Sequence, residues 1–437
     1  MRPGSGARKP ARGRNAGVLA LSLTAVLALS VSQSAATQYQ QRQQPQRSPQ
    51  QTAPKTLQPA PLPQQYQSQR PQYAPPPSSQ TSAEQMLASR IRSIGENFDG
   101  DIGIAVQDVQ TGYTAAYDGN TFFPQQSVSK FWVALTALDR ADRGHLSLEA
   151  PVTVTKNDLT LFHQPIAKLV GSGGYTTTIN SLMYRAITQS DNTCNDFVLW
   201  KAGGPDAVRS FLRDKRISGI RFGPGERSLQ ARIAGMEWRP SMVGSAFYAA
   251  RNALPMSVRR AAFENYIRDP MDGATPLGTV DALARLKKGE LLSPRSTEKL
   301  LSIMSNTKTG AQRLKGGLAP GWRLAHKTGT GQVLGGTQAG YNDIGIVTSP
   351  SGKSYAVAVF IRRTSAPLPH RMQAMQNTVR AVVAYSQNLP AQTFANRSMR
   401  VPNAQPPMKA PVKVQQVPGF QAVAATVQSL PEEEEGE

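Results

Sequence analysis

The sequence contains few of the residues that build disulfide-linked or metal-bound scaffolds. Its 437 residues include one cysteine, Cys194, and four histidines, at positions 145, 163, 326 and 370. A single thiol excludes an intramolecular disulfide and any multi-cysteine zinc or iron–sulfur site. The histidines form no H-E-x-x-H motif. We therefore expect no metal and no cofactor, and we expect Cys194 to pack as a small apolar side chain.

Acidic residues are scarce relative to basic ones. The chain has 28 Asp and Glu against 49 Lys and Arg, which gives a net charge of +21. Such an excess can indicate a nucleic-acid partner. The position of this charge argues against a nucleic-acid partner, because residues 1–82, outside the foldable region, hold nine of the basic residues and no acidic residue. No nucleic-acid-binding motif accompanies the remaining charge, so no nucleic-acid partner is predicted.

The N-terminal apolar run is too short for a transmembrane helix. Residues 18–31 number 14, fewer than the roughly 20 that a helical span needs. The run follows five basic residues and precedes the small residues of Ser32-Gln-Ser-Ala-Ala36, an order typical of a secretory signal peptide, here residues 1–36. No cysteine follows it, so no lipid anchor is expected. We predict an exported protein, periplasmic or secreted in the bacterial cell envelope, without stable membrane insertion.

Composition separates one foldable region from two polar segments. Residues 37–82 are mostly Gln, Pro and Ser, and such a stretch cannot bury enough apolar area to offset its ordering entropy, which predicts a disordered linker. Residues 389–437 are again rich in Pro, Gln and Val and end in a run of glutamates, which predicts a disordered tail. The remaining residues, 83–388, are predicted to form one catalytic domain.

The foldable region has strand patterns at its ends and helix patterns between them. Alternating apolar residues at 101–108, a Gly turn and residues 113–117 predict one hairpin, and residues 343–348 and 354–361 predict another. Helical periodicity is found at 131–143, 178–189, 197–201, 206–214, 279–286 and 296–305. The order predicts one antiparallel sheet built from both ends of the domain, with a helical lobe inserted.

The first chemical motif is Ser127-Val-Ser-Lys130. Two further S-x-x-K matches, at 296–299 and 305–308, show that chance often supplies this pattern. Ser127 differs because an apolar helix pattern follows it, so its hydroxyl is expected at a helix N-terminus with Lys130 one turn later. The free N–H groups there favour a developing negative charge, and a buried lysine can lose its proton and act as a base. The alternative is an ordinary helix-capping serine.

Two further motifs follow in the chain. Ser190-Asp-Asn192 occurs once, directly after a helix pattern, and its alternative interpretation is a polar loop or cap. Lys327-Thr-Gly329 lies in a strand pattern, where Lys327 can face a groove and Gly329 can let a ligand approach the backbone. A second K-T-G, at 308–310, ends a helix pattern and is interpreted as a helix stop.

The order S-x-x-K, S-D-N and K-T-G resembles that of the penicillin-recognising serine hydrolases. The surrounding residues are similar to class A β-lactamases over about residues 101–386, for example FPQQSVSKFWVALTALDRADRGHL, TTTINSLMYRAITQSDNT and GWRLAHKTGTG. The resemblance implies an α/β (α+β) fold, with a five-stranded antiparallel sheet flanked by helices and an all-α lobe that carries Ser190.

The resemblance also implies roles for matching residues. Ser127 would be the acylated nucleophile, Lys130 its proton partner, and Ser190 the group that relays a proton to the leaving nitrogen. The substrate-binding residues would be Asn192, at the amide side chain of the substrate, and Lys327 and Thr328, at its carboxylate, in the strand that continues through Gly329. The backbone N–H groups of Ser127 and Thr330 would form the oxyanion hole.

The sequence departs from the family in the Ω loop, where the family has E-x-x-L-N to hold the hydrolytic water. No E-x-x-x-N follows Ser190 here. The first candidate is Glu226, with Gln230 in place of the asparagine; the second is Glu237. A solvent-facing surface glutamate is the alternative for both. From Glu226 the chain runs 48 residues to Ala274, longer than in the family, which predicts one or two added helices beside the pocket.

These observations rank three functions. The leading one is a β-lactamase that opens the ring of a small β-lactam through an acyl-enzyme on Ser127. The second is a peptidoglycan-directed D,D-carboxypeptidase or transpeptidase-like acyltransferase, and the third is a non-hydrolytic protein that binds β-lactams or cell-wall peptides. His163 is expected either at the mouth of the cleft or in an ordinary surface loop.

Overall fold

Both ends of the folded region contribute to one central antiparallel sheet. Strand β1 (Asp101–Asp108) pairs with β10 (Ser354–Thr364), and Val106 lies opposite Val357 although about 250 residues separate them. The strand order is β2-β1-β10-β9-β7, with β2 at Thr114–Tyr117, β7 at Arg323–Thr330 and β9 at Thr337–Thr348. The predicted five-stranded sheet is confirmed, and a two-residue strand, β8 (Val333–Leu334), adds to β9 outside this path.

The computed structural model describes residues 81–388, which belong to one compact unit. The predicted signal peptide, nearly all of the linker at 37–82, and the tail at 389–437 lie outside the described residues. Helix α2 (Ser82–Glu96) begins at the end of the linker range, and the Thr81 side chain caps it by accepting from the Glu84 N–H. Among residues 81–388, no helix combines the length and the apolar character that crossing a membrane requires.

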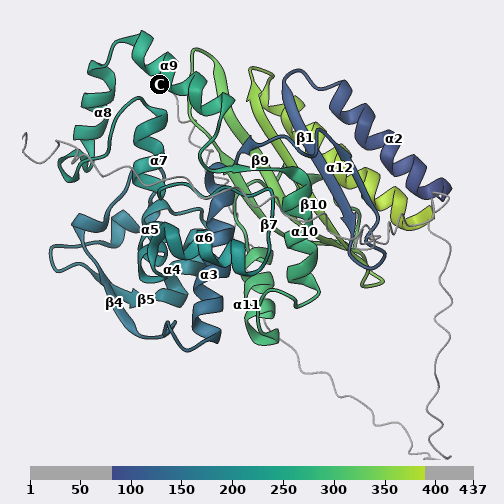
Figure 1. The fold of residues 1–437 in the computed structure, drawn as a ribbon, viewed down its shortest axis with the longest axis horizontal. Helices are drawn as coiled ribbons and strands as arrows, with labels where there is room; N and C mark the ends of the chain where they lie inside the picture. Colours follow the sequence, from purple (N-terminus) through teal and green to yellow (C-terminus); the bar gives the residue numbers. More distant parts are fainter. Residues whose placement is uncertain (1–80, 389–437) are drawn as a thin grey trace, which may run out of the picture. The chain divides into compact units, whose positions relative to one another are not determined.

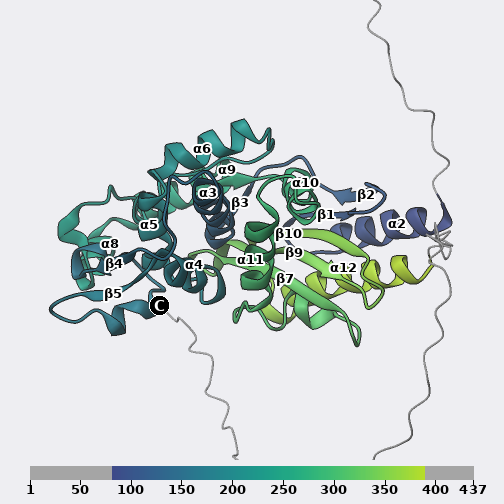
Figure 2. The same cartoon turned by 90° about the horizontal axis from the view of Figure 1, so that it is seen from below.

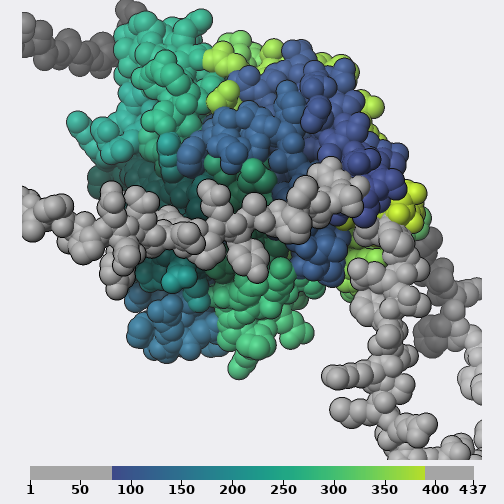
Figure 3. All heavy atoms as spheres, turned by 45° about the vertical axis from the view of Figure 1, so that its right-hand side comes forward, coloured from purple at the N-terminus to yellow at the C-terminus, as the bar shows by residue number. Residues whose placement is uncertain are grey.

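Helices cover both faces of the sheet. Helices α2 and α12 (Leu368–Asn388) lie side by side against one face, where Leu87 and Val379 join the core made by Ile104 and Val357 (Figures 1 and 2). On the surface, residues from the two ends of the described chain adjoin, purple beside yellow (Figure 3). Helix α10 (Pro276–Lys287) packs on the opposite face. The sequence patterns had not indicated α2 or α12, since both helices carry polar residues over much of their surface.

The helical lobe supplies the other half of the fold, as expected. Its elements are α3 (Lys130–Asp142), α4 (Ile179–Thr188), α5 (Asn192–Lys201), α6 (Gly204–Asp214) and α11 (Pro294–Ser305), with a small hairpin of β4 (Pro151–Val154) and β5 (Tyr175–Thr178). The first ten residues of α3 are all buried, so this helix runs through the centre of the lobe. Cys194 is fully buried, and burial raises the pKa of its thiol, which keeps the thiol unreactive as a packed apolar group.

The long segment after Glu226 contains two added helices, as predicted. Helix α7 (Glu226–Ile233) is followed by α8 (Ser245–Ala253) and α9 (Met256–Arg268), and the chain then enters β6 (Gly273–Ala274), which pairs with β3 (Phe123–Pro124). Phe263 and Ile267 of α9 pack against Leu229 of α7, while Phe247 of α8 shares an apolar cluster with Ala231 of α7. The insertion therefore braces α7 from both sides (Figure 1).

Candidate active site

Ser127 and Lys130 lie at the start of the central helix. Ser127 belongs to a short 3-10 turn, Gln126–Ser129, that leads directly into α3, and Lys130 is the first residue of α3. One helical turn brings the two side chains together, and Lys130 Nζ donates to Ser127 Oγ at 2.7 Å. Ser127 is half-buried, whereas Lys130 is 1% exposed. The serine is therefore partly accessible to solvent, while the lysine is shielded from water.

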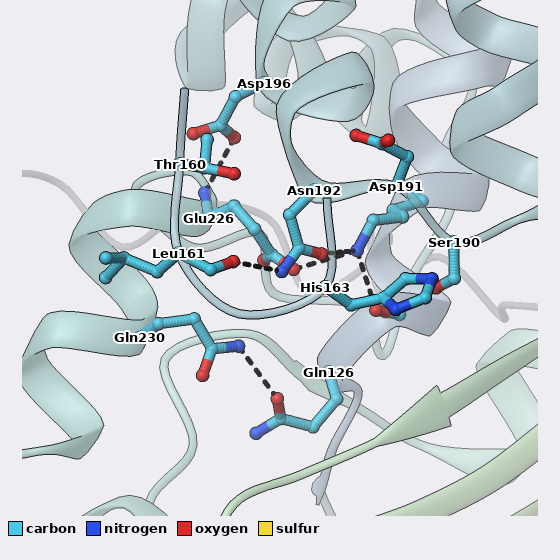
Figure 4. Close-up of polar contacts among 12 residues, drawn as sticks. Gln126, Thr160, Leu161, His163, Ser190, Asp191, Asn192, Asp196, Glu226 and Gln230 are labelled. Atoms are coloured by element: carbon cyan, nitrogen blue, oxygen red, sulfur yellow. Dashed lines mark hydrogen bonds and ion pairs between the residues drawn. The ribbon is translucent and has the colours of Figure 1, made fainter. Parts of the chain in front are cut away.

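Lys130 is bonded to three acceptors. Besides Ser127 Oγ, its Nζ donates to Asn192 Oδ1 and to Glu226 Oε1, both at 2.8 Å (Figure 4). An ammonium group has three N–H donors, so every one is used. Burying a charge is costly unless it is paired and hydrogen-bonded, and Glu226, itself 3% exposed, supplies the opposite charge. The arrangement connects the expected nucleophile to the expected deacylation base through one nitrogen atom.

Ser190 and Lys327 form a second serine–lysine pair. Ser190 precedes α5 with a left-handed φ of 60°, and Lys327 Nζ on β7 donates to Ser190 Oγ at 2.9 Å and to the Thr328 carbonyl at 2.8 Å. Lys327 is fully buried, and burial, together with the nearby charges of Lys130 and Arg313, lowers its pKa well below the usual range. An anion bound beside Lys327 would raise this pKa again and favour the protonated, positively charged side chain.

Arg313 is a site residue that the sequence reasoning missed. Its guanidinium donates to the Gly329 carbonyl at 3.0 Å and to Thr330 Oγ1 at 2.6 Å, and it stacks on the ring of Tyr341 at 3.8 Å. It comes from the loop after α11, outside all three motifs, so only its basic side chain marked it in the sequence. The second K-T-G lies in the same loop, where Thr309 bonds Thr328 at 2.6 Å. The guanidinium thus adds a second positive charge beside Lys327.

Gly329 has a packing role that the sequence analysis did not predict. A side chain there would collide with the backbone carbonyl of Gln125, in the segment just before Ser127. The predicted approach of a ligand to this glycine stays a prediction. The glycine lets β7 approach the turn that carries Ser127. Thr330, one residue further along β7, is exposed.

Asn192 uses both ends of its amide within the protein. Its Oδ1 accepts from Lys130, and its Nδ2 donates to the Leu161 carbonyl at 2.8 Å. Its predicted contact with a substrate amide stays a prediction. His163, two residues after Leu161, is exposed, and its Nε2 bonds the Gln189 carbonyl at 2.8 Å, which places the ring at the Ser190 end of the site (Figure 4).

Glu226 is held by its position at the beginning of α7. The N–H of Glu226 donates to Asp196 Oδ1 at 2.8 Å, and the N–H of Arg227 donates to Asp196 Oδ2 at 3.2 Å. Burial and the charge of Glu226 raise the pKa of Asp196 to about 6. The sequence reasoning missed Asp196, although its position four residues after Asn192 on α5 places both on one face of that helix.

The second glutamate candidate does not lie in the site. The side chain of Glu237 is 73% exposed and pairs with Arg232 at 3.4 Å on the surface. Of the two predicted glutamates, only Glu226 contacts the Ser127–Lys130 pair. Gln230, one turn after Glu226, is 5% exposed and donates to Gln126 Oε1 at 3.0 Å.

The fold and the site define a serine-dependent acyl-transfer enzyme, because buried Lys130 links a half-buried serine at the start of a helix to a buried carboxylate, and a second buried lysine bonds a second serine. Residues 86–386 match the model of the β-lactamase enzyme family, and the chain belongs to this family. No group of three or more His, Cys, Asp or Glu within the described residues could hold a metal ion.

Individual relatives agree with this assignment. The chain is 29% identical to β-lactamase VEB-1 of Pseudomonas aeruginosa, over 63% of this chain and 82% of that protein, and 27% identical to the extended-spectrum β-lactamase PER-1 of the same organism, over 65% and 82%. Among solved structures, a β-lactamase of Chitinophaga pinensis superposes with a TM-score of 0.56 at 27% identity, covering 68% of this chain and 97% of that one. An ancestral class A β-lactamase gives 0.53 at 29% identity, covering 68% and 98%. The resemblance to class A enzymes is confirmed.

Proposed function

We propose that this protein is an exported β-lactamase that opens β-lactam rings through an acyl-enzyme on Ser127. The observation that carries the proposal is the bonding of Lys130, whose Nζ contacts both Ser127 Oγ and Glu226 Oε1. One nitrogen thus links the group that attacks the ring to the group that activates water. The signal sequence at residues 1–36 supports export.

Acylation begins with proton transfer from Lys130 to Glu226. The resulting neutral amine accepts the Ser127 proton while Oγ attacks the carbonyl carbon of the ring. The backbone N–H groups of Ser127 and Thr330 stabilise the oxyanion, and Ser190 gives a proton to the amide nitrogen as the C–N bond breaks. Ser190 regains a proton from Lys130, and Glu226 then returns its own proton to Lys130. The net change is the movement of one proton from Ser127 to that nitrogen and the formation of an ester.

Deacylation requires a water molecule beside Glu226. The carboxylate of Glu226 takes a proton from this water, whose oxygen attacks the ester carbon. As the ester bond to Ser127 breaks, Ser127 Oγ takes a proton from Lys130, and Glu226 passes the proton from water to Lys130, so that all three groups return to their starting state. Gln230, one turn further on α7, is the residue that we assign to hold the water, as the asparagine does in the family. Lys327, Arg313 and Thr328 bind the carboxylate that most β-lactams carry, since two buried basic side chains lie close enough for the charge of Arg313 to lower the pKa of Lys327.

A second candidate follows from the same departure from the family pattern. In the described structure the Gln230 amide is already bonded to Gln126 and Gln332. If that leaves no place for the water, the enzyme would transfer its acyl group slowly, as a peptidoglycan-directed D,D-carboxypeptidase or transpeptidase does. A non-hydrolytic binding protein is the third candidate.

Turnover of a chromogenic cephalosporin by purified residues 37–437 separates the three functions. We expect many turnovers per enzyme, with a transient adduct on Ser127 visible in intact-mass spectra. A wild-type protein that is acylated once and stays acylated would contradict the β-lactamase and favour the second candidate. The absence of any adduct would favour the binding protein.

A further inference from the structure

The residue before the nucleophile has an unusual backbone. Gln126 has a φ of 53°, one of five left-handed non-glycine residues in the described part of the chain. Such a conformation costs free energy and persists where neighbours hold it. The Gln126 N–H donates to Asp272 Oδ2 at 2.8 Å, and Gln126 is 1% exposed. The turn that presents Ser127 is therefore fastened to a buried carboxylate from the end of the inserted segment.

Tyr266 of the added helix α9 closes this contact into a ring. Gln126 Nε2 donates to the Tyr266 hydroxyl at 2.7 Å, and that hydroxyl donates to Asp272 Oδ2 at 3.2 Å. Tyr266 and Asp272 are 3% and 1% exposed. Asp272 Oδ1 is buried and has no hydrogen-bond partner among the described residues, an arrangement that is costly for a carboxylate and calls for a functional explanation.

The ring continues into the helix that carries Glu226. Gln230 Nε2 donates to Gln126 Oε1 at 3.0 Å, and Gln332 Nε2 donates to Gln230 Oε1 at 2.9 Å (Figure 4 shows the first contact). The four side chains therefore form one chain of bonds from Asp272 to Gln230. Its members come from four segments: α9, the residues between α9 and β6, the turn that carries Ser127, and α7.

The Asp272 carboxylate fixes which group donates and which accepts in each of these hydrogen bonds. An ionised carboxylate only accepts hydrogen bonds, so the Tyr266 hydroxyl must donate to Asp272 and accept from the amide nitrogen of Gln126. Gln126 then has only its oxygen left to face Gln230, which must present its nitrogen. The orientation of the Gln230 amide is set by a residue that does not touch it.

We infer that Tyr266 and Asp272 are positioning residues for deacylation, which orient Gln230 toward the hydrolytic water through Gln126. The inference rests on the proposed function of Glu226 and Gln230. Neither residue touches the reacting atoms, so their removal should slow the release of the acyl group more than its formation. A merely structural role would lower stability and leave the ratio of the two rates unchanged.

The test is Tyr266→Phe, which removes only the hydroxyl. We expect the deacylation rate, followed by the loss of the Ser127 adduct in intact-mass spectra, to fall about tenfold while the acylation rate stays within about twofold. Tyr385→Phe is the matched control, because Tyr385 is also buried and bonds a buried aspartate, Asp108, at 3.4 Å outside the site. The control should change neither rate, whatever it does to the melting temperature.

A second variant covers the case in which Tyr266→Phe does not fold. Gln126→Met keeps the size of the side chain and leaves the Tyr266–Asp272 bond, but it breaks the link to Gln230; the adduct should persist as in Tyr266→Phe. Unchanged deacylation in Gln126→Met, or an equal loss in Tyr266→Phe and Tyr385→Phe, would overturn the inference. A wild-type protein that stays acylated would instead contradict the proposed function.

Discussion

The two halves of the active site are specified in different ways. The acylation half comprises the residues that we propose for acylation, and they lie in short motifs on elements of the core: Ser127, Lys130, Ser190 and Lys327. The deacylation half depends on α7, whose Glu226 is fastened by Asp196 of α5 and whose Gln230 is connected to Tyr266 of α9. A nucleophile can thus be encoded within four residues, whereas the place of a water molecule depends on contacts between segments far apart in the chain.

The largest effect should come from the nucleophile itself. Ser127→Ala removes the attacking oxygen, and we expect turnover of a cephalosporin to fall at least about 10⁴-fold with no mass adduct. Ser129→Ala, in the same turn, is the control and should change turnover by less than about twofold. An adduct that still forms in Ser127→Ala would place the nucleophile elsewhere.

The next effect tests the anchor of the deacylation half. Asp196→Ala leaves the backbone N–H groups of Glu226 and Arg227 without their acceptor, so α7 should shift and the catalytic carboxylate with it. A displacement of about 1 Å can cost about 100-fold, and we expect that loss in kcat with accumulation of the acyl-enzyme. Asp206→Ala, at the exposed start of α6, should have no effect on either rate. Equal acylation and deacylation losses in Asp196→Ala would show that the anchor serves the whole site.

A smaller effect tests the cation that the motifs did not contain. Arg313→Lys keeps the charge but loses the forked bonds to Gly329 and Thr330, so the KM for a β-lactam carboxylate should rise about tenfold with little change in kcat. Arg371→Lys is matched, because Arg371 is buried and also lies over the ring of Tyr341. A similar rise in KM for Arg371→Lys would assign the effect to packing around Tyr341.

Much of the acylation half could be predicted from the sequence, because its motifs lie next to strong periodic patterns. The helix after Ser127 and the strand around Lys327 placed both side chains correctly. Arg313 and Asp196 could not be predicted, since neither belongs to a motif and each acts through contacts with another segment. The same holds for α2 and α12, whose burial is decided by a sheet that the sequence assembles from both ends.

The choice between Glu226 and Glu237 shows where sequence reasoning stops. Both glutamates follow Ser190 at plausible spacing, and each has neighbours that resemble the family's loop. Only the packing of α9 on α7 and the bonds of Asp196 hold Glu226 in contact with Lys130 and leave Glu237 on the surface. The role of Gly329 was likewise set by a backbone segment some 200 residues away, just before Ser127.

The smallest effect is a pH dependence of the inserted segment. Burial, followed by the charge of Glu226, raises the pKa of Asp272 to about 7; the ionisable groups facing it are Tyr266 on α9 and Glu226 on α7. A carboxyl whose pKa is raised on folding stabilises the fold below its unfolded pKa, and this contribution is lost as the pH rises through about 7. The hydrogen-bond chain from Asp272 to Gln230 needs the ionised Asp272 carboxylate, so the deacylation rate should rise a few-fold as the pH rises over the same range.

Asp272→Asn sharpens this prediction because it removes the titration while keeping the shape. Denaturant midpoints measured between pH 4 and pH 8 should decline less with pH in the variant than in the wild type. Its deacylation rate should be low and should lose the component that rises near pH 7. A wild-type profile that the variant reproduces would show that Asp272 does not titrate in this range.

The most direct measurement compares the two glutamates by intact-mass spectrometry during reaction with a cephalosporin. In Glu226→Ala we expect Ser127 to be acylated and to stay acylated for minutes to hours, because the water has lost its base. Glu237→Ala should clear its adduct as fast as the wild type. A Glu226→Ala protein that deacylates normally, or a long-lived adduct in Glu237→Ala, would contradict the assignment of the deacylation half to α7.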